Sequence, residues 1–236
     1  MNCKLYYWPA PFRGNFIRLL LEEAGEKYQE ASVEEILELY SKPVEVQPLP
    51  MMAPPYLHDL DHDVFLSQMP VIVMHLSRKL GFLPDDAFKS SVCLKLVLDS
   101  NDILAEITNL NGNTMWEYEK WKEFRQKRLK RWLEMFEETG KGFGLSSKSE
   151  YMLGGDQISM ADLVTEALWG TMIRCFPDLA EDCRRHAPNV FQLIQRIEIR
   201  PKIKSFIERQ QQSYGSSYCG GQIEKSIRSM LEKDRQ

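Results

Sequence analysis

Cysteine and histidine are the side chains of this sequence that could hold a metal ion or carry thiol chemistry. His58 and His62 are four residues apart, but they lie in the turn-rich stretch HDLDHD, which favours a solvated hairpin over a metal site. The cysteines form no CxxC pair and show no zinc-site spacing; they are Cys3, Cys93, Cys175, Cys183 and Cys219. Their odd number indicates reduced thiols in a cytoplasmic protein rather than a disulfide framework. We therefore expect no metal site.

Two neighbouring tyrosines, Tyr6 and Tyr7, end an aromatic stretch that precedes a proline-rich loop and Arg13. A phenol hydroxyl can donate a hydrogen bond to a neighbouring anion and so favour its charged form. Successive residues of a strand face opposite ways, so only one of the two can serve a given site. The spacing to the following helix favours Tyr7, and the alternative is a buried strand aromatic without a chemical role.

The elements that must position these residues alternate between strand and helix as far as Pro84. Strands are predicted at 3–8, 28–33, 54–59 and 64–66, and helices at 15–24, 34–40 and 67–80. A strand, a helix and a strand within about 30 residues form a βαβ unit with parallel strands. The later two strands surround a polar turn and predict an antiparallel hairpin. We expect Ser67 to cap the helix that follows, with Pro70 in its first turn.

After Pro84 only helical periodicity remains. The predicted helices are 86–110, 116–138, 159–174, 179–185, 188–198 and 200–210, and a charged helical stretch follows the piece YGSSYCGG. Ser159 and Asp162 have the spacing of a capping box at a helix start. The chain therefore predicts a strand-and-helix domain followed by an all-helical one, within the α+β class.

The charge pattern indicates neither a nucleic-acid nor a membrane partner. The formal net charge is -4, and no apolar run is long enough to span a bilayer. The segment 120–132 mixes basic and aromatic residues, but Trp121, Phe124, Arg128, Leu129 and Trp132 trace one helical face with charges opposite. A solvated amphipathic helix is favoured there. The N-terminus also lacks an apolar signal-peptide region, so we expect a soluble, cytoplasmic protein.

Three stretches, in this order, resemble the cytosolic glutathione transferases that use a tyrosine, such as the sigma, alpha, mu and pi classes. They are 5–8 with 13–19, 53–57 with 66–68, and 158–163. The resemblance implies a thioredoxin-like βαβαββα domain at 1–81 that binds glutathione. It further implies a linker at 82–86 and an all-helical domain at 87–236 that supplies a wall of the electrophile site.

The resemblance assigns Tyr7 to the stabilisation of the glutathione thiolate, with Arg13 nearby. A cysteine thiol has a pKa of ~8.5, so only a few per cent is ionised near neutral pH. Lowering that pKa by about two units is worth roughly 2.7 kcal/mol. Glutathione would be the co-substrate, and no metal is implied.

The same resemblance makes Pro54-Pro55 the entry to a strand that aligns the middle of glutathione. One register makes Pro55 the cis residue and Pro54 the residue that pairs with the tripeptide, although Pro54 has no N–H to donate. The other register makes Pro54 cis and Ala53 the pairing residue. The sequence leaves both open, and an ordinary edge-strand entry is the alternative.

The charged ends of glutathione are assigned to four further positions. Gln68 and the backbone N–H of Met69 would hold the γ-glutamyl end at a helix N-terminus, although the family usually has a hydroxyl residue in place of Met69. Asp102 would reach the γ-glutamyl amine across a dimer interface, with a solvent-facing carboxylate as the alternative. Lys42 would meet the glycyl carboxylate.

The sequence therefore predicts a homodimeric glutathione transferase that conjugates glutathione to small apolar electrophiles in detoxification. The electrophile would bind between the two domains, against walls that include Trp8, Phe12, Met115 and Trp116. Two alternatives remain: a non-catalytic ligand-binding or structural protein on the same fold, and a glutathione-dependent isomerase.

Overall fold

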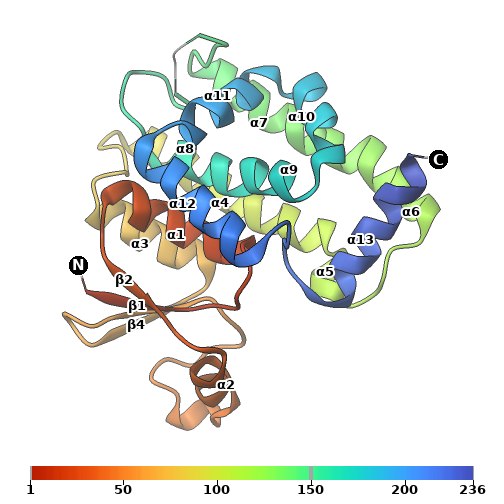
Figure 1. The fold of residues 1–236 in the computed structure, drawn as a ribbon. Coiled ribbons are helices and arrows are strands. Elements are labelled where there is room, and N and C mark those ends of the chain that lie inside the picture. Colours follow the sequence, from red (N-terminus) through yellow and green to blue (C-terminus); the bar gives the residue numbers. More distant parts are fainter. Residues whose placement is uncertain (1, 149–150, 236) are drawn as a thin grey trace.

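The computed structural model describes residues 2–148 and 151–235, and it has the expected α+β architecture (Figure 1). The N-terminal part contains β1 (Cys3–Tyr6), α1 (Phe12–Ala24), β2 (Tyr28–Glu30), α2 (Val33–Ser41), η1 (Val44–Val46), β3 (Tyr56–Asp59), β4 (Val64–Ser67) and α3 (Met69–Lys79). The strands lie in the order β2-β1-β3-β4. β1 pairs with β2 in parallel and β3 with β4 antiparallel, as predicted, and β1 also pairs with β3 antiparallel.

Alternation along β1 separates two packing layers. Cys3 and Leu5 are fully buried in the main core with α1 and α3, which pack against one another on one face of the sheet. Tyr6 faces the other way, toward a small cluster that contains Leu39 of α2 and Tyr56 of β3. Figure 1 shows α2 on the far side of the sheet from α1 and α3. The sheet therefore presents Tyr7, the next inward residue, to the layer of α1.

Two predicted boundaries in this part were wrong for local reasons. β2 ends at Glu30 because Ser32 accepts a hydrogen bond from the backbone N–H of Glu35 and starts α2 with a capping box. Ser67 does not cap α3, since it is the last residue of β4, and Gln68 takes the N-cap position.

The C-terminal part is helical throughout the residues that the structure describes. It contains α4 (Ala87–Ile107), α5 (Asn109–Gly112), α6 (Tyr118–Glu123), η2 (Phe124–Leu129), α7 (Lys130–Gly142), α8 (Met160–Thr165), η3 (Glu166–Gly170), α9 (Thr171–Cys175), η4 (Pro177–Leu179), α10 (Ala180–His186), α11 (Pro188–Glu198), α12 (Pro201–Tyr214) and α13 (Gly221–Asp234). The predicted charged helix at the C-terminus is α13, which lies beside α5 and α6 (Figure 1).

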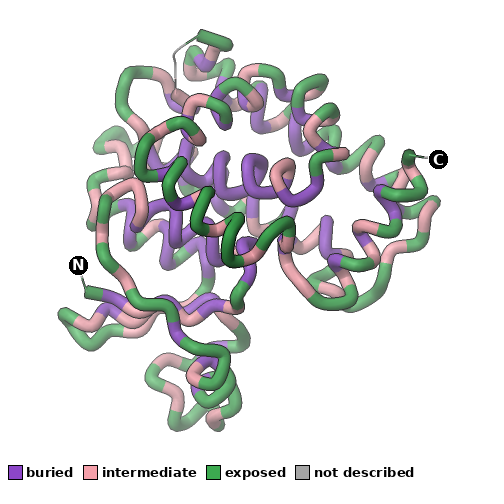
Figure 2. Tube along the Cα trace, viewed as in Figure 1, coloured by how far each residue is buried: buried purple, intermediate pink, exposed green. Residues whose placement is uncertain are grey.

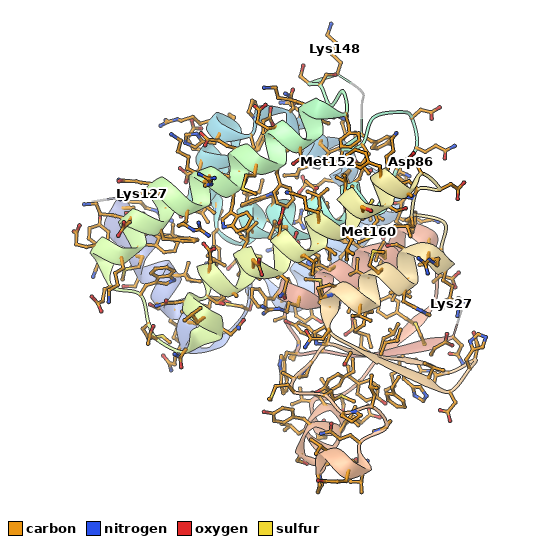
Figure 3. The ribbon with its side chains drawn as sticks, turned by 180° about the vertical axis from the view of Figure 1, so that it is seen from behind. Lys27, Asp86, Lys127, Lys148, Met152 and Met160 are labelled. Atoms are coloured by element: carbon orange, nitrogen blue, oxygen red, sulfur yellow. The ribbon has the colours of Figure 1, made fainter. Side chains whose placement is uncertain are left out.

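The helix predicted at 116–138 is continuous from α6 through α7 but contains a π-helical turn, η2. The wider turn moves Arg128 off the apolar face, where it was expected, and onto the surface, where it pairs with Glu106. Leu129 and Trp132 keep the buried face. Lys127 is exposed, pairs with Glu123 of the same helix and points outward in Figure 3. Arg125 is partly buried and pairs instead with Asp182 and Asp234. This segment is therefore an amphipathic helix with a solvated face.

The start of the buried helix α8 is the predicted capping box. The Asp162 carboxylate accepts hydrogen bonds from the Ser159 N–H at 2.8 Å and from the Ser159 hydroxyl at 2.7 Å. It also accepts from the N–H of Met152 at 2.7 Å. Met152 and Met160 are fully buried near Asp86, which caps α4 (Figure 3). The N–H of Met160, the first residue of α8, donates to the Phe82 carbonyl at 2.8 Å and so connects α8 to the segment that leads out of the N-terminal part.

The two parts share one apolar core, and buried residues gather where α1 meets α8 and α9 (Figure 2). A buried polar chain also crosses the boundary. The Asn15 side chain of α1 donates to the Thr171 hydroxyl at 3.0 Å and to Gln210 of α12 at 2.9 Å. Arg174 bonds Thr171 and also pairs with Glu166. The start of α1 is therefore fixed against the helical part. No helix within the described residues is long and apolar enough to cross a bilayer.

Candidate functional site

Tyr7 lies directly after β1 and is only 5% exposed. Its phenol oxygen accepts a hydrogen bond from the backbone N–H of Arg13 at 3.2 Å. Within residues 2–148 and 151–235, no group accepts the proton of the Tyr7 hydroxyl. Burial raises the pKa of Tyr7 to about 12, against the lowering effect of the Arg13 charge and N–H. The phenol is therefore protonated at neutral pH, and it can donate to a group bound beside it.

Tyr6, the competing phenol, occupies a different environment. Its ring lies 6.4 Å from the ring of Phe65, on the face of the sheet that α2 covers. The structure therefore separates the two tyrosines, and only Tyr7 adjoins the start of α1.

The Arg13 side chain is held by two asparagines of the helical part, and its predicted place near a glutathione thiolate stays a prediction. Its Nε donates to Asn101 of α4 at 3.2 Å, and its Nη2 donates to Asn111 of α5 at 2.9 Å. Asn111 and its neighbour Leu110 have left-handed backbone, at φ 60° and 58°. Arg13 thus contacts the phenol through its backbone and the helical domain through its side chain.

Arg18 supports the loop after Tyr7 from behind. It is 1% exposed, and it donates to the Ala10 carbonyl at 2.8 Å and to both oxygens of Glu30 at 2.6 and 2.8 Å. Its guanidinium carbon lies 5.8 Å from the Tyr7 ring centroid. Sequence reasoning gave Arg18 no role. The available signal was an arginine on the inward face of an otherwise apolar helix.

Pro54-Pro55 contains the cis peptide bond, so Pro55 is the cis residue and the open question of register is answered. Pro54 is then the residue that precedes the cis proline, and it has no N–H. β3 begins at the next residue, Tyr56, which pairs with Tyr6. The Pro54 carbonyl is consequently the only backbone polar group that this residue can offer a ligand.

Gln68 joins β4 to α3 with φ 71° and ψ 118°, a conformation that non-glycine residues rarely adopt. Its side chain is exposed and has no hydrogen-bond partner in the described part of the chain. Backbone strain of this kind persists where the surrounding structure imposes it, and it concentrates at functional sites. The first N–H groups of α3, from Met69 and Val71, have no helical partner and attract an anion. The Met69 side chain is buried in the main core.

The decisive comparison concerns the helical part. Residues 92–230, more than half of the chain, match the family model described as Glutathione S-transferase, C-terminal domain. The chain belongs to the glutathione S-transferase family. The family resemblance inferred from the three motif stretches is thereby confirmed.

Individual relatives agree with this assignment. Glutathione S-transferase P of Bos taurus is 27% identical over 207 residues, which cover 86% of this chain and 90% of that protein. Glutathione S-transferase class-mu 26 kDa isozyme 1 of Fasciola hepatica is 28% identical over 213 residues, covering 88% and 87%. The solved Pi-class glutathione S-transferase of Onchocerca volvulus superposes with a TM-score of 0.75 at 20% identity, covering 94% of this chain and 98% of that one. The last comparison supports the thioredoxin-like and all-helical fold alone.

Two predicted glutathione contacts lie apart from Tyr7. Asp102 is exposed on α4, one helical turn after Leu98. Lys42 is half-buried at the end of α2, and its ammonium lies 3.8 Å from Glu38. Neither contacts Tyr7 or Gln68, so their roles stay predictions.

The four residues predicted to wall the electrophile site have different environments in the structure. Met115 is 43% exposed, whereas Trp8 and Trp116 are partly buried against the core. Phe12 is buried, and the ring of Tyr218 meets it edge-on at 5.2 Å. Four cavities of 740, 660, 470 and 200 Å³ lie elsewhere, and none of them is lined by Tyr7, Trp8 or Phe12.

Tyr218 is the second residue that sequence reasoning missed. It precedes α13, is 1% exposed, and its hydroxyl has no partner in the described residues. The piece YGSSYCGG is typical of a flexible connection because glycine and serine dominate it. No local pattern indicates that Tyr218, its second tyrosine, is buried. The contact with Phe12 joins opposite ends of the chain.

Proposed function

We propose that this protein is an enzyme that transfers the thiolate of glutathione to a small apolar electrophile. The observation that carries the proposal is the Tyr7 hydroxyl, which is fixed by the Arg13 N–H and has its own proton free to donate. A donor directed at a sulfur stabilises the thiolate and lowers the thiol pKa. The Arg13 N–H also makes the phenol a better donor, since it lowers the pKa of Tyr7.

The region around Tyr7, Pro54 and Gln68, here called the glutathione half, supports binding of the tripeptide. Gln68 presents a free amide beside the unpaired N–H groups of α3, where the γ-glutamyl carboxylate would bind with help from the helix dipole. The Pro54 carbonyl would accept the cysteinyl N–H. The reciprocal bond is missing because Pro54 has no N–H, and we expect weaker glutathione binding for that reason.

The region around Trp8, Phe12, Met115 and Trp116, here called the electrophile half, would hold the apolar partner. In the proposal, holding both substrates adjacent contributes to the rate along with the thiolate chemistry. The division into a glutathione-binding domain at 1–81, a linker at 82–86 and a helical domain from 87 is part of the same proposal. So is a cytoplasmic location, which the five free cysteines support.

We also propose that the protein is a homodimer. Leu94 and Leu98 are exposed at 38% and 47% and stand one turn apart on α4, and Asp102 continues the same stripe. Val71 of α3, a helix that packs on α4, is 51% exposed. Exposed apolar side chains gathered on adjoining elements are typical of an interface. Asp102 would then lie at the subunit boundary, which supports its predicted reach to the partner's glutathione.

The test combines a glutathione-affinity column with a chlorodinitrobenzene assay on the wild type, Tyr7→Phe and Tyr6→Phe. We expect all three to be retained, and Tyr7→Phe to lose at least tenfold in turnover, corresponding to about 1.4 kcal/mol or more. Tyr6→Phe is the matched control and should keep wild-type turnover. Equal loss in both variants, or none in Tyr7→Phe, would remove Tyr7 from the chemistry.

A non-catalytic glutathione-binding protein is the second candidate, because Tyr218 fills the space beside Phe12. Retention of the wild type on the column without turnover of any electrophile would favour it. A glutathione-dependent isomerase would be distinguished by analysis of the product, since an isomerase releases glutathione unchanged.

A further inference from the structure

Residues 215–220, here called the strap, connect α12 to α13 and carry Tyr218 toward the Tyr7 site. Figure 1 shows this connection passing from the end of α12 to the region of α5. The Tyr218 ring is packed edge-on against Phe12 at 5.2 Å and against Phe176 at 5.0 Å. The strap therefore contributes a fully buried aromatic ring next to the loop that holds Tyr7.

The Tyr218 hydroxyl is buried and has no hydrogen-bond partner in the described residues. Burial raises the pKa of Tyr218 well above its usual value, and the ionisable groups facing its phenol are Cys219, Cys175, Arg13 and Tyr7. The ring thus lies in an apolar position between Phe12 and Phe176, and Tyr7 is one of the ionisable groups near its hydroxyl. A buried hydroxyl without a hydrogen-bond partner costs free energy. The arrangement in which the Tyr218 ring packs against Phe12, here called the closed form, carries this cost.

We propose that Tyr218 determines access to the electrophile half: its ring occupies the position of an aromatic electrophile, and the strap must move outward before such a substrate binds. This inference rests on the proposed function, because it concerns the second substrate of that site. The proposed substrates are compounds with a flat aromatic ring the size of a phenol or slightly larger.

The strap is a preformed unit. One oxygen of Glu224 accepts the N–H groups of Tyr218, Cys219 and Gly220 at 2.9, 2.9 and 2.6 Å. Arg228 pairs with the other oxygen at 2.7 Å. These bonds lie within the strap and α13, so they hold the shape of the strap without fastening it to the Tyr7 site.

Few polar contacts attach the strap to the rest of the protein. The Cys175 thiol donates to the Ser217 carbonyl at 3.3 Å, and Arg228 donates to the Cys175 carbonyl at 3.3 Å. At its start, Gly215 has φ 58° and ψ -130°, which a side chain would strain. The main obstacle to outward movement is the packing of Tyr218 itself. A substrate that binds only the open form has its apparent affinity reduced by the fraction of protein that is open.

The first experiment compares Tyr218→Ala with Tyr218→Phe, which keeps the ring, in chlorodinitrobenzene kinetics. We expect Tyr218→Ala to lower the KM for chlorodinitrobenzene about tenfold by removing the closed state. Tyr218→Phe should stay within about twofold of wild type, and the KM for glutathione should change in neither variant. An unchanged KM for chlorodinitrobenzene in Tyr218→Ala, or an equal change in both variants, would overturn the proposal.

A second measurement uses the wild type and stands if Tyr218→Ala fails to fold. Oxidative labelling of the Tyr218 ring, which is 1% exposed, is followed in the free protein, with glutathione, and with S-dinitrophenylglutathione, which carries an aromatic ring. We expect slow labelling in the first two states and faster labelling in the third. Equal labelling in all three states would overturn the proposal.

A third measurement separates failure of this inference from failure of the proposed function. Binding of the fluorescent probe anilinonaphthalene sulfonate needs no glutathione, and we expect Tyr218→Ala to bind it more tightly than wild type. A wild type that does not bind glutathione, together with this gain, would reject the proposed function and keep Tyr218 as the occupant. Normal glutathione conjugation without the gain would reject Tyr218.

Discussion

The two halves of the candidate site are built in different ways. The glutathione half consists of backbone groups and short-range geometry: the Arg13 N–H on Tyr7, the carbonyl before Pro55, and the first turn of α3 after Gln68. The electrophile half depends on side chains from distant parts of the chain, and Tyr218 fills it. In the proposed account, the first half is therefore ready for a ligand, whereas the second must change before it binds one.

This difference explains why the family's sequence motifs predict the glutathione half but not the electrophile half. Backbone geometry depends on a few adjacent residues, so proline, glutamine and tyrosine at fixed places carry it. Packing between the two ends of the chain has no local pattern. We therefore expect substitutions of residues that support the glutathione half, such as Arg18, to lower the free energy of unfolding. Substitutions in the strap should change substrate choice.

The largest effect is expected for Arg18→Ala, which tests whether Arg18 stabilises the loop after Tyr7. The change leaves the Ala10 carbonyl and Glu30 without their buried partner and opens a cavity. We expect a loss of about 3 kcal/mol in the free energy of unfolding, measured by urea denaturation.

Arg209→Ala is the matched control, because Arg209 pairs with Glu22 at 2.7 Å but is 54% exposed. Exposed ion pairs contribute about 1 kcal/mol or less, so this variant should remain close to wild type. If both variants lost the same amount, the loop after Tyr7 would not depend on Arg18.

A smaller effect concerns the junction between the two domains, at Glu166. Burial raises the pKa of this carboxyl to about 8 from an ordinary 4.5, although Arg174 favours its charged form. Gly170 allows this arrangement, since a Cβ there would lie 1.9 Å from the carboxylate. Between about pH 4.5 and 8 the native state thus binds a proton that the unfolded chain has lost.

Stability should consequently fall as the pH rises through this window and level off above it. Glu166→Gln cannot titrate, so we expect it to gain about 2 kcal/mol relative to wild type between pH 5 and pH 8, measured by urea unfolding. Glu198→Gln should narrow this pH window, because the charge of Glu198 helps to raise the pKa of Glu166. Parallel curves for wild type and Glu166→Gln would show that the buried carboxyl does not titrate in this range.

The smallest effect is expected for Pro54→Ala, which sharpens the description of the glutathione half. Alanine restores the N–H that proline lacks, and one hydrogen bond of about 1 kcal/mol corresponds to roughly fivefold tighter glutathione binding. Calorimetric titration measures this change, with Pro201→Ala in α12 as a proline control that should have no effect. Unchanged or weaker binding in Pro54→Ala would mean that glutathione does not pair with this residue.

Much of the fold was predictable because it follows from periodicity and local signals. The order of strands and helices along the chain, the Ser159–Asp162 cap and the charged C-terminal helix all have sequence patterns of their own. The π-helical turns were not predictable, since η3 depends on the fit between Glu166 and Gly170 within one packed helix. The same applies to Arg128, which a π-helical turn moved to the surface.

A site residue could be predicted from the sequence when its partners lie close to it along the chain. Tyr7 and Gln68 could be assigned from their neighbours, but the direction of the Arg13 side chain depends on Asn101 and Asn111 in the other domain. Tyr218 depends on Phe12, at the opposite end of the chain. Packing over such separations is decided by the complete fold, so inspection of the sequence could not reveal it.

The most direct test of the central claim is the pKa of the thiol of glutathione bound to the wild type and to Tyr7→Phe, followed by thiolate absorbance against pH. The Tyr7 hydroxyl should hold the wild-type value about two units below the ~8.5 of a free cysteine thiol, and Tyr7→Phe should return it close to that value. The same bound pKa in both proteins would contradict the account, because the phenol would then have no part in forming the thiolate.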